Sequence, residues 1–313
     1  MIQFSDLISF SSLMSTLGTA TIVILAALGC LLTEQAGMMN IGLDGIITAG
    51  AFVAGVVSWL TGSWILGLLA AVAAGLLLGL FYGVMVIRLR SDEFVIGVTL
   101  NVFLTALSTF LFRNLPDAAN GLHLEDGSGM AIPAITLGRE GASPISVSVL
   151  VPVTLALVAL CQVFLYRTRH GFWLRASGEH PESLQSVGRS PAKMKYAASL
   201  ACGAFCGLAG AYLLNYVLGF TEGISASRGY VAVACVIFGR SNPALVTLAA
   251  IFFGLVDTVG QRLQVAQIID STLTGAFPYV GTILMMLVLA IRNQRKKPGK
   301  SREEPDPDTA CTK

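Results

Sequence analysis

The chain has 313 residues, of which 54% are hydrophobic and 12% are charged, and its mean hydropathy is +0.74. Soluble domains carry roughly 25% charged residues, so this composition excludes a water-soluble protein over most of the length. The formal net charge of +2 is uninformative about partners, and we expect a surrounding of membrane lipid and no nucleic acid partner. Apolar runs long enough to cross roughly 30 Å of hydrocarbon recur, which predicts an all-α polytopic membrane protein.

Nine hydrophobic segments are predicted to span the membrane, with a range of eight to ten. In chain order they are 14–32, 45–61, 64–87, 94–112, 145–166, 196–218, 229–239, 243–260 and 272–291. Before the second span, EQAGMMNIGLDG (34–45) is polar and glycine-rich, which fits either a loop or the unwound part of a broken helix. The seventh span is short, and the Gly and Pro residues at 239–243 indicate either a helix pair with a tight turn or a partly re-entrant element.

Lysine and arginine determine the predicted orientation, because loops rich in them stay in the cytoplasm. Sixteen of the 20 basic residues share one side if 88–93, 167–195, the GRSNP turn and the tail from Arg292 lie there together. We therefore place these segments and the C-terminus in the cytoplasm, and the N-terminus outside. The predicted organisation is a transmembrane domain over 1–291 and a disordered, Pro- and charge-rich tail over 292–313.

Two apolar stretches resemble each other across this topology. LGLFYGVMVIRL (78–89) and FGLVDTVGQRL (253–263) share a Gly-Leu start and an Arg-Leu end, and they run in opposite directions in the predicted arrangement. They are either traces of an inverted repeat, which is a recurring transporter architecture, or a chance likeness of two apolar helices.

Several enzyme signatures are absent from the sequence. It has no Walker A motif to hold ATP phosphates, no HExxH and no GxSxG. The three histidines, His123, His170 and His180, fall in predicted loops without metal-ligand spacing. We therefore predict that the protein is not an enzyme and holds neither a cofactor nor a metal.

Few ionisable or amide side chains lie in the predicted spans, chiefly Asn101, Asn215 and Asp257. Each asparagine either hydrogen-bonds a polar solute or joins two helices, a contact worth about 0.6 kcal/mol. Asp257 lies near the outer end of its span, where capping or pairing with Arg262 is favoured over proton coupling. A proton- or sodium-driven carrier normally keeps intramembrane charges, so we expect the energy for any transport to come from elsewhere.

A polar segment, GEHPESLQSVGRSP (178–191), lies between two apolar runs, inside the predicted cytoplasmic loop 167–195. We call this segment the polar island. Pro181 suits the first turn of a helix, Glu182 complements the helix N-terminal dipole, and Gly188 suits the helix end. A short surface helix over PESLQSV is therefore predicted. This helix is too polar to enter lipid, so it either faces water or docks on a partner.

Four ordered stretches carry a family resemblance that covers roughly residues 20–290. EQAGMMNIGLDGIITAGAF (34–52) resembles the ERAGVLNIGLEG-type signature of permease subunits in binding-protein-dependent ABC importers, in the simple-sugar and nucleoside branch related to ribose-type permeases. The island 178–191, ACGAFCGLAGAY (201–212) and FTEGISASRGYVAVACVIFGRSNP (220–243) agree with the same family. Gln35 replaces a common basic residue and Asp44 a common Glu, and both departures leave the resemblance intact.

The resemblance implies a ribose-type ABC permease fold in a bacterial cytoplasmic (inner) membrane. It implies three kinds of protein partner: a separate ABC ATPase, a second permease subunit, preferably an unlike one, and an extracytoplasmic solute-binding protein. The implied cargo is a small polar solute, with nucleosides ahead of simple sugars and riboflavin behind both. Two alternatives stay open from the residues alone, an ion-coupled secondary transporter and a membrane scaffold that does not transport.

The resemblance also implies functional residues in two regions. The island would form the helix that couples to the ATPase, with its shape set by Glu179, Pro181 and Gly188, while Leu184 and Val187 enter the ATPase cleft.

Five residues are expected to line the solute path: Asn40, Gly42, Asp44, Asn101 and Asn215. Glu222 and Arg228, in a predicted outer loop, either contact the binding protein or pair with each other. Gly203, Gly207 and Gly210 are expected to serve helix packing alone.

Overall fold

The computed structural model describes residues 10–115, 132–137, 145–265, 280–283 and 287. In this part of the chain, seven helices are long and apolar enough to cross a membrane. They are α2 (Phe10–Gln35), α3 (Leu43–Thr61), α4 (Trp64–Gly83) with its π-helical continuation η1 (Val84–Arg88), α5 (Glu93–Arg113), α6 (Leu150–Arg167), α9 (Pro191–Val217) and α11 (Pro243–Val265). The prediction of an all-α polytopic membrane protein is confirmed.

The shorter elements lie between the long helices. They are strands β1 (Ala134–Leu137) and β2 (Ile145–Ser148) and helices α7 (Arg169–Glu179), α8 (Pro181–Ser186) and α10 (Arg228–Phe238). The predicted seventh span corresponds to α10, which has only 11 residues and cannot cross about 30 Å of hydrocarbon at 1.5 Å per residue. The predicted ninth span, 272–291, falls mostly outside the described residues. Within it the structure describes 280–283 and 287, and these are helical.

The predicted fifth span begins too early in the chain. Residues 145–148 form β2, which pairs antiparallel with β1 from Ala134↔Ser148 to Leu137↔Ile145, and α6 begins only at Leu150. The ISVS sequence alternates β-branched and small polar residues, which is a two-residue period typical of a strand. The apolar run therefore divides into a strand and a helix.

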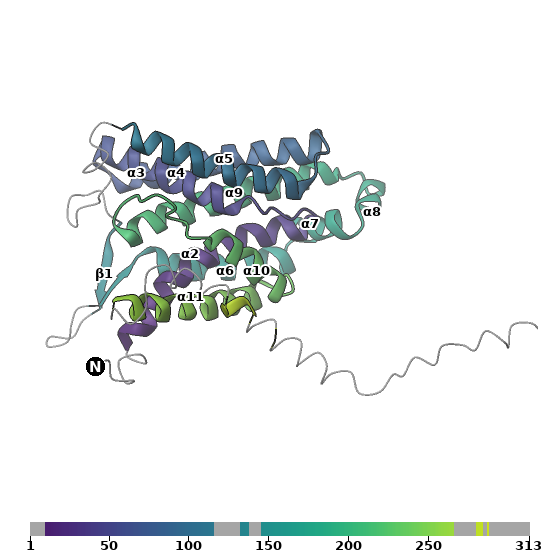
Figure 1. The fold of residues 1–313 in the computed structure, drawn as a ribbon. Helices are drawn as coiled ribbons and strands as arrows, with labels where there is room; N and C mark the ends of the chain where they lie inside the picture. Colours follow the sequence, from purple (N-terminus) through teal and green to yellow (C-terminus); the bar gives the residue numbers. More distant parts are fainter. Residues whose placement is uncertain (1–9, 116–131, 138–144, 266–279, 284–286, 288–313) are drawn as a thin grey trace, which may run out of the picture.

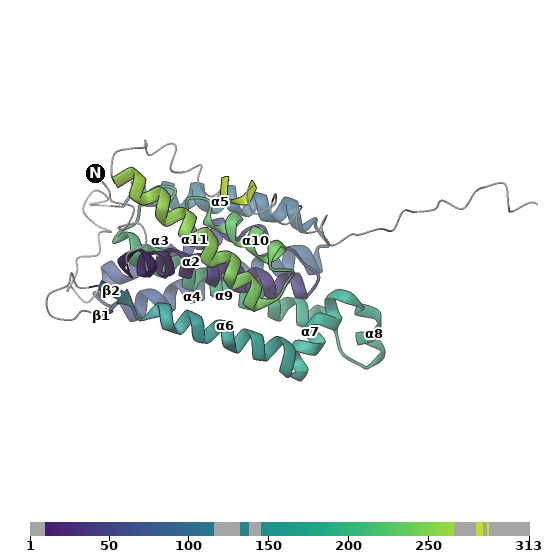
Figure 2. The same cartoon turned by 90° about the horizontal axis from the view of Figure 1, so that it is seen from below.

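The long helices form a bundle around α2, which is buried along most of its length (Figure 1). In both views the helix pair α7 and α8 projects from one end of the bundle, and the hairpin β1–β2 lies at the other end (Figure 2). Helix α9 packs closely on α4, because a side chain on Gly79 or Gly203 would collide with the facing helix backbone. The predicted packing role of Gly203 is confirmed, as are those of Gly207 and Gly210.

The loops predicted to share one side do lie at one end of the bundle. The Gln35 side chain donates a hydrogen bond to the Ser241 carbonyl at 3.0 Å, and Gly37 contacts Gly178 in the loop 167–195. Residues 91–93 and Lys195 line one cavity of about 410 Å³ together with Gly37. This clustering matches the predicted topology, in which these loops share one side of the membrane.

Two irregular segments run into the bundle from its opposite ends. Residues 36–42 leave α2 and reach the start of α3, and residues 218–227 leave α9 and reach the start of α10. The first turns of α3 and α10 meet, since the Gly229 N–H donates to Asp44 at 3.0 Å. Residues 36–42 are therefore unwound between two helices. The seventh predicted span is a short helix that begins inside the bundle and is joined to α11 by the turn 239–242, so it also forms the predicted helix pair.

Candidate functional site

A groove of about 650 Å³ starts where α3, α5 and α10 meet and runs along α5. We call it the polar groove. It is lined by Asp44, Asn101, Val102, Thr105, Ala106, Thr109, Phe110, Arg113 and Tyr230. Asn101 lies eight residues from Glu93 and twelve from Arg113, so its end of the groove is about 12 Å from one end of α5 and about 18 Å from the other.

Helix α5 supplies the polar wall of this groove. Asn101, Thr105, Thr109 and Arg113 follow one another at four-residue intervals and so share one face of the helix. The stripe leads from mid-depth to the end of the bundle that carries the hairpin. Asn101 was predicted from the sequence and the two threonines were not, although the four-residue spacing that continues from Asn101 indicates them.

Asn101 closes the inner end of the groove and is hydrogen-bonded there to three groups. Its Oδ1 accepts from the Gly45 N–H at 2.7 Å, and its Nδ2 donates to the Ile41 carbonyl at 2.9 Å and to the Tyr230 hydroxyl at 3.0 Å. Gly45 is packed against the α5 backbone so closely that a side chain there would lie 2.8 Å from the Asn101 Cα. Asn101 therefore joins three elements, and of the two roles left open by the sequence, the structural one is observed.

Asp44 lies beside Asn101 and holds the start of α10. Its Oδ1 accepts from the Gly229 N–H at 3.0 Å, and its Oδ2 accepts from the Ser225 hydroxyl at 2.9 Å. A carboxylate has about four lone-pair positions, so these two bonds leave capacity on the side that faces the groove. Asp44 is the anionic acceptor at the groove floor.

The remaining residues predicted for the solute path lie elsewhere. Asn40 is fully buried and accepts from the Gly42 N–H at 2.8 Å, so both belong to the segment that supports the floor. Asn215 accepts from the Ile132 N–H at 2.7 Å and faces a different, much smaller cavity. The structure thus brings Asp44 and Asn101 together, with Asn40 and Gly42 behind them, and does not bring Asn215 to the groove.

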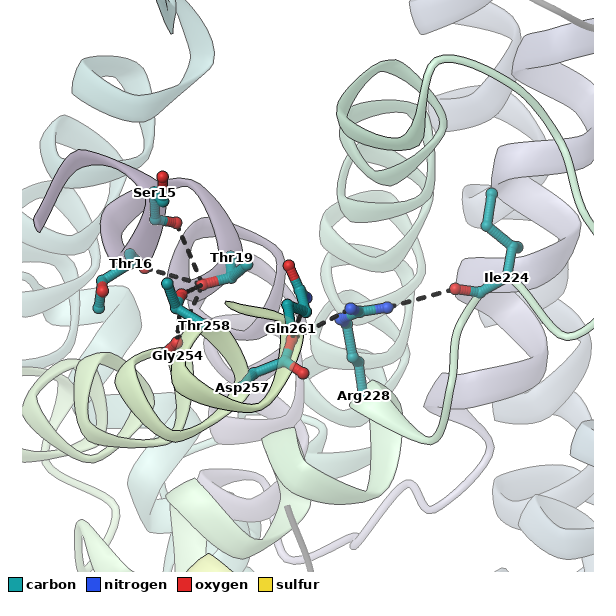
Figure 3. Close-up of polar contacts among 9 residues, drawn as sticks. All are labelled: Ser15, Thr16, Thr19, Ile224, Arg228, Gly254, Asp257, Thr258 and Gln261. Carbon is teal, nitrogen blue, oxygen red and sulfur yellow. Dashed lines mark hydrogen bonds and ion pairs between the residues drawn. The ribbon is translucent and has the colours of Figure 1, made fainter. Parts of the chain in front are cut away.

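An ion pair lies inside the bundle next to the groove (Figure 3). Arg228 Nη2 is 3.1 Å from Asp257 Oδ2, with side chains only 13% and 21% exposed, and Gln261 donates to the same oxygen at 3.2 Å. Arg228 also donates to the Ile224 carbonyl at 3.3 Å. Capping or pairing with Arg262 was expected for Asp257, and the structure shows an ion pair with Arg228.

The placement of Arg228 in an outer surface loop is corrected by this geometry. The segment before it folds back into the bundle, so Arg228 opens α10 and faces α11. Its pairing with Glu222, one of the two alternatives, is also wrong. Glu222 instead forms a two-pronged ion pair with Arg113, at 2.7 and 2.8 Å, at the outer end of the polar groove. These hydrogen bonds lower the pKa of the Glu222 carboxyl below its ordinary value.

The polar island folds as its local signals predict. Helix α8 starts with Pro181 in its first turn, and Gly188 follows it with φ of +76°, a left-handed conformation that favours glycine. Val187 is 74% exposed, whereas Leu184 is only 4% exposed. The expectation that Leu184 enters a partner's cleft is corrected, because α8 packs against α7 and α9 and the Leu184 side chain is buried.

Helix α7, immediately before the island, was not predicted from the sequence. It is capped by Thr168, whose hydroxyl accepts from the Gly171 N–H at 3.1 Å. The Arg189 guanidinium lies 4.2 Å from the centre of the Trp173 ring and so ties the end of the island back onto α7. The two helices therefore form one braced unit, which we call the α7–α8 unit.

The α7–α8 unit touches the support of the groove floor through two glycines. Gly37 has φ of +76°, and a side chain on it would lie 2.9 Å from the Gly178 Cα. A side chain on Gly178 would in turn lie 2.5 Å from the Gln35 carbonyl oxygen. This backbone contact connects α7 to segment 36–42, and through it to Asn101 and Asp44.

The comparisons with known proteins agree with this architecture. Residues 12–291 match the family described as branched-chain amino acid transport system / permease component. A putative glucose ABC transporter permease protein of Haloferax volcanii is 30% identical over 90% of this chain and 92% of its own. A guanosine ABC transporter permease protein of Bacillus subtilis is 30% identical over 87% and 89%, and a nucleoside ABC transporter permease protein of Lactococcus lactis is 28% identical over 85% and 88%.

The same three organisms each contribute a second permease protein that is less similar to this chain. The identities are 23% in Lactococcus lactis, 24% in Bacillus subtilis and 26% in Haloferax volcanii, over 68% to 73% of those longer chains. No solved structure matches the chain.

Proposed function

The chain belongs to the branched-chain amino acid transport system / permease component family, and on this premise we propose that it forms half of the pore of an ABC importer for a nucleoside or a simple sugar. Its relatives are permease proteins, which are transporter components and not enzymes. The observation that carries the proposal is the polar groove, which offers hydrogen-bonding side chains from mid-depth to one end of a bundle of apolar helices.

The groove serves as one wall of the solute path, and a second permease supplies the other. It is open along α5, where Val102, Phe103 and Phe110 are exposed beside the polar stripe. A solute in a one-sided groove would still face lipid, so an unlike permease is the preferred covering chain. The pairs of similar permeases in three organisms support this choice.

The cargo is inferred from the relatives and from the groove. The three relatives are named for glucose, guanosine and nucleosides, which places these solutes ahead of riboflavin. All are rich in hydroxyl groups. The groove matches them in kind, because it combines hydroxyl, amide and carboxylate side chains with an exposed aromatic ring.

A separate ATPase drives the pore by acting on the α7–α8 unit. Val187 is the apolar contact that this unit offers to a partner, and the bracing by Arg189 and Trp173 lets it move as a rigid body. Displacement of α7 would pass through Gly178 and Gly37 to the floor of the groove. An extracytoplasmic binding protein delivers the solute at the opposite end, near Arg113 and Glu222. The protein lies in the inner membrane of a bacterium, with its C-terminus in the cytoplasm.

The proposal is tested by reconstituting the chain with an ABC ATPase, an unlike permease and a solute-binding protein from the same organism, and measuring uptake of guanosine and glucose with and without ATP. Uptake by the chain alone under an ion gradient would contradict it. A cysteine at Thr105, labelled with a charged thiol reagent, should block uptake by obstructing the groove. The matched control is a cysteine at Val163, an exposed position on α6 away from the groove. The five described native cysteines are buried and should react slowly.

A further inference from the structure

Tyr230 stands at the inner end of the polar groove and was not among the residues expected from the sequence. It lies in the first turn of α10, and 41% of its surface is exposed. Its hydroxyl contacts the Asn101 amide at 3.0 Å, and it lines the same groove as Asp44. The direction of that hydrogen bond decides what the hydroxyl can offer to a solute.

The backbone around Asn101 determines this direction. The Ile41 carbonyl can only accept and the Gly45 N–H can only donate, so the amide must turn its Nδ2 toward Ile41 and its Oδ1 toward Gly45. Tyr230 is contacted by the same Nδ2, which is a donor. The phenolic oxygen of Tyr230 therefore accepts from Asn101, and its hydrogen is left to donate in another direction.

Asp44 supplies the complementary group. Both of its known partners, the Gly229 N–H and the Ser225 hydroxyl, donate to it, and the carboxylate retains lone pairs on the groove side. A hydroxyl group of a solute can accept from Tyr230 and can donate to Asp44. An ether or a methylene in the same place can satisfy at most one of the two.

We propose that Tyr230 and Asp44 form a donor–acceptor pair that recognises hydroxyl groups of the passing solute, with Tyr230 as a specificity-determining residue of the pore. This inference rests on the proposed function, because it assigns a role to the groove as a solute path. It adds a second selection for hydroxylated solutes, inside the membrane, after the selection made by the binding protein.

The experiment measures initial uptake by the complete reconstituted importer. The probes are guanosine and its 2′-, 3′- and 5′-deoxy analogues, or glucose and its monodeoxy analogues if glucose is the solute transported. Each rate for Tyr230→Phe is divided by the wild-type rate for the same probe, which cancels the selection made by the binding protein. We expect uptake of the parent solute to fall about two- to tenfold, the range of one neutral hydrogen bond, while one deoxy analogue is unaffected.

Two further variants separate recognition from support of Asn101. Tyr230→O-methyltyrosine keeps the oxygen that accepts from Asn101 and lacks only the hydrogen. Like Tyr230→Phe, it should therefore lose the preference for the parent solute over one deoxy analogue. Tyr166→Phe is the matched control, since Tyr166 is 43% exposed on α6 and lies outside the groove. That variant should keep the wild-type preference.

The outcomes are distinct. Equal losses for the parent solute and every analogue, or a preference retained by the O-methyltyrosine variant, would reduce Tyr230 to a structural support and overturn the inference. A wild-type importer that treats the parent and all its analogues alike would also overturn it. Absence of ATP-dependent uptake by the wild-type complex would instead overturn the proposed function itself.

Discussion

At the scale of single residues, the Arg228–Asp257 ion pair lies inside the described bundle, with both side chains mostly buried. Each charge lies largely out of water, and each compensates the other. Removal of one partner leaves a partly buried charge unpaired, whereas removal of both leaves none. The pair thus fixes the start of α10 against α11 and indirectly positions Gly229 on Asp44.

We expect Asp257→Asn to lower the free energy of unfolding by about 1–3 kcal/mol, because Arg228 loses its charged partner. The double variant Arg228→Gln with Asp257→Asn should recover part of that loss. Thermal unfolding of the purified protein in detergent measures both. A double variant whose loss equals the sum of the two single losses would show that the charges do not interact.

The Arg113–Glu222 pair predicts a pH dependence at the outer end of the groove. Its hydrogen bonds lower the pKa of the Glu222 carboxyl, so the folded state favours the ionised form. The stabilisation is therefore fully present above the ordinary carboxyl pKa and is lost as the pH falls through the lowered value. The effect is small because both side chains are exposed to water.

Thermal unfolding should be measured for the wild type and for Glu222→Gln between pH 7 and pH 3. The difference in stability between the two proteins should shrink only at the acidic end. Arg113→Gln should remove the same pH-dependent difference, because it removes the cause of the pKa shift. A difference between wild type and Glu222→Gln that is constant across this range would contradict the assignment.

At the scale of elements, Gly188 offers a clean test of the α7–α8 unit. Gly188→Ala places a side chain on a left-handed backbone, which costs about 1–2 kcal/mol and should distort the end of the unit. We expect ATP-driven uptake and solute-stimulated ATPase activity to fall severalfold, with membrane insertion retained. The measurement is ATPase activity of the assembled complex with and without solute.

The control is Gly62→Ala, in the turn between α3 and α4. Gly62 has φ of +66° and, like Gly188, has no atom within 4 Å of the position that a side chain would take. It lies outside the α7–α8 unit. The two variants should therefore lose similar stability but differ in coupling, and equal coupling in both would remove the role assigned to this unit.

The elements also differ in how readable they were from the sequence. The long helices were predicted because each is a continuous apolar run. Helix α8 was predicted because Pro181 and Gly188 mark its two ends in the local sequence. The hairpin was missed because its second strand is only four residues at the start of a longer apolar run. The inward path of residues 218–227 was also missed, since polarity alone placed Glu222 and Arg228 together in one outer loop. Contacts such as Arg228–Asp257 join residues 29 positions apart and depend on the packing of whole helices.

At the scale of the whole molecule, the orientation in the membrane remains a prediction from the basic residues. Gln185, in α8, is exposed at one end of the bundle, and Asn114 is exposed after α5 at the other end. A cysteine at position 185 should react with an impermeant thiol reagent only after the cells are opened, whereas a cysteine at position 114 should react in intact cells. The reverse pattern would invert the topology and, with it, the side on which the ATPase docks.

The meeting of α3 and α10 also bears on what kind of molecule can cross. The N-terminal end of each helix is equivalent to roughly half a positive elementary charge, and both ends converge on the single negative charge of Asp44. Arg228 and Asp257 cancel each other nearby. The floor of the groove is thus polar but close to electroneutral, so it can exchange hydrogen bonds with a neutral solute without trapping ions in the middle of the membrane.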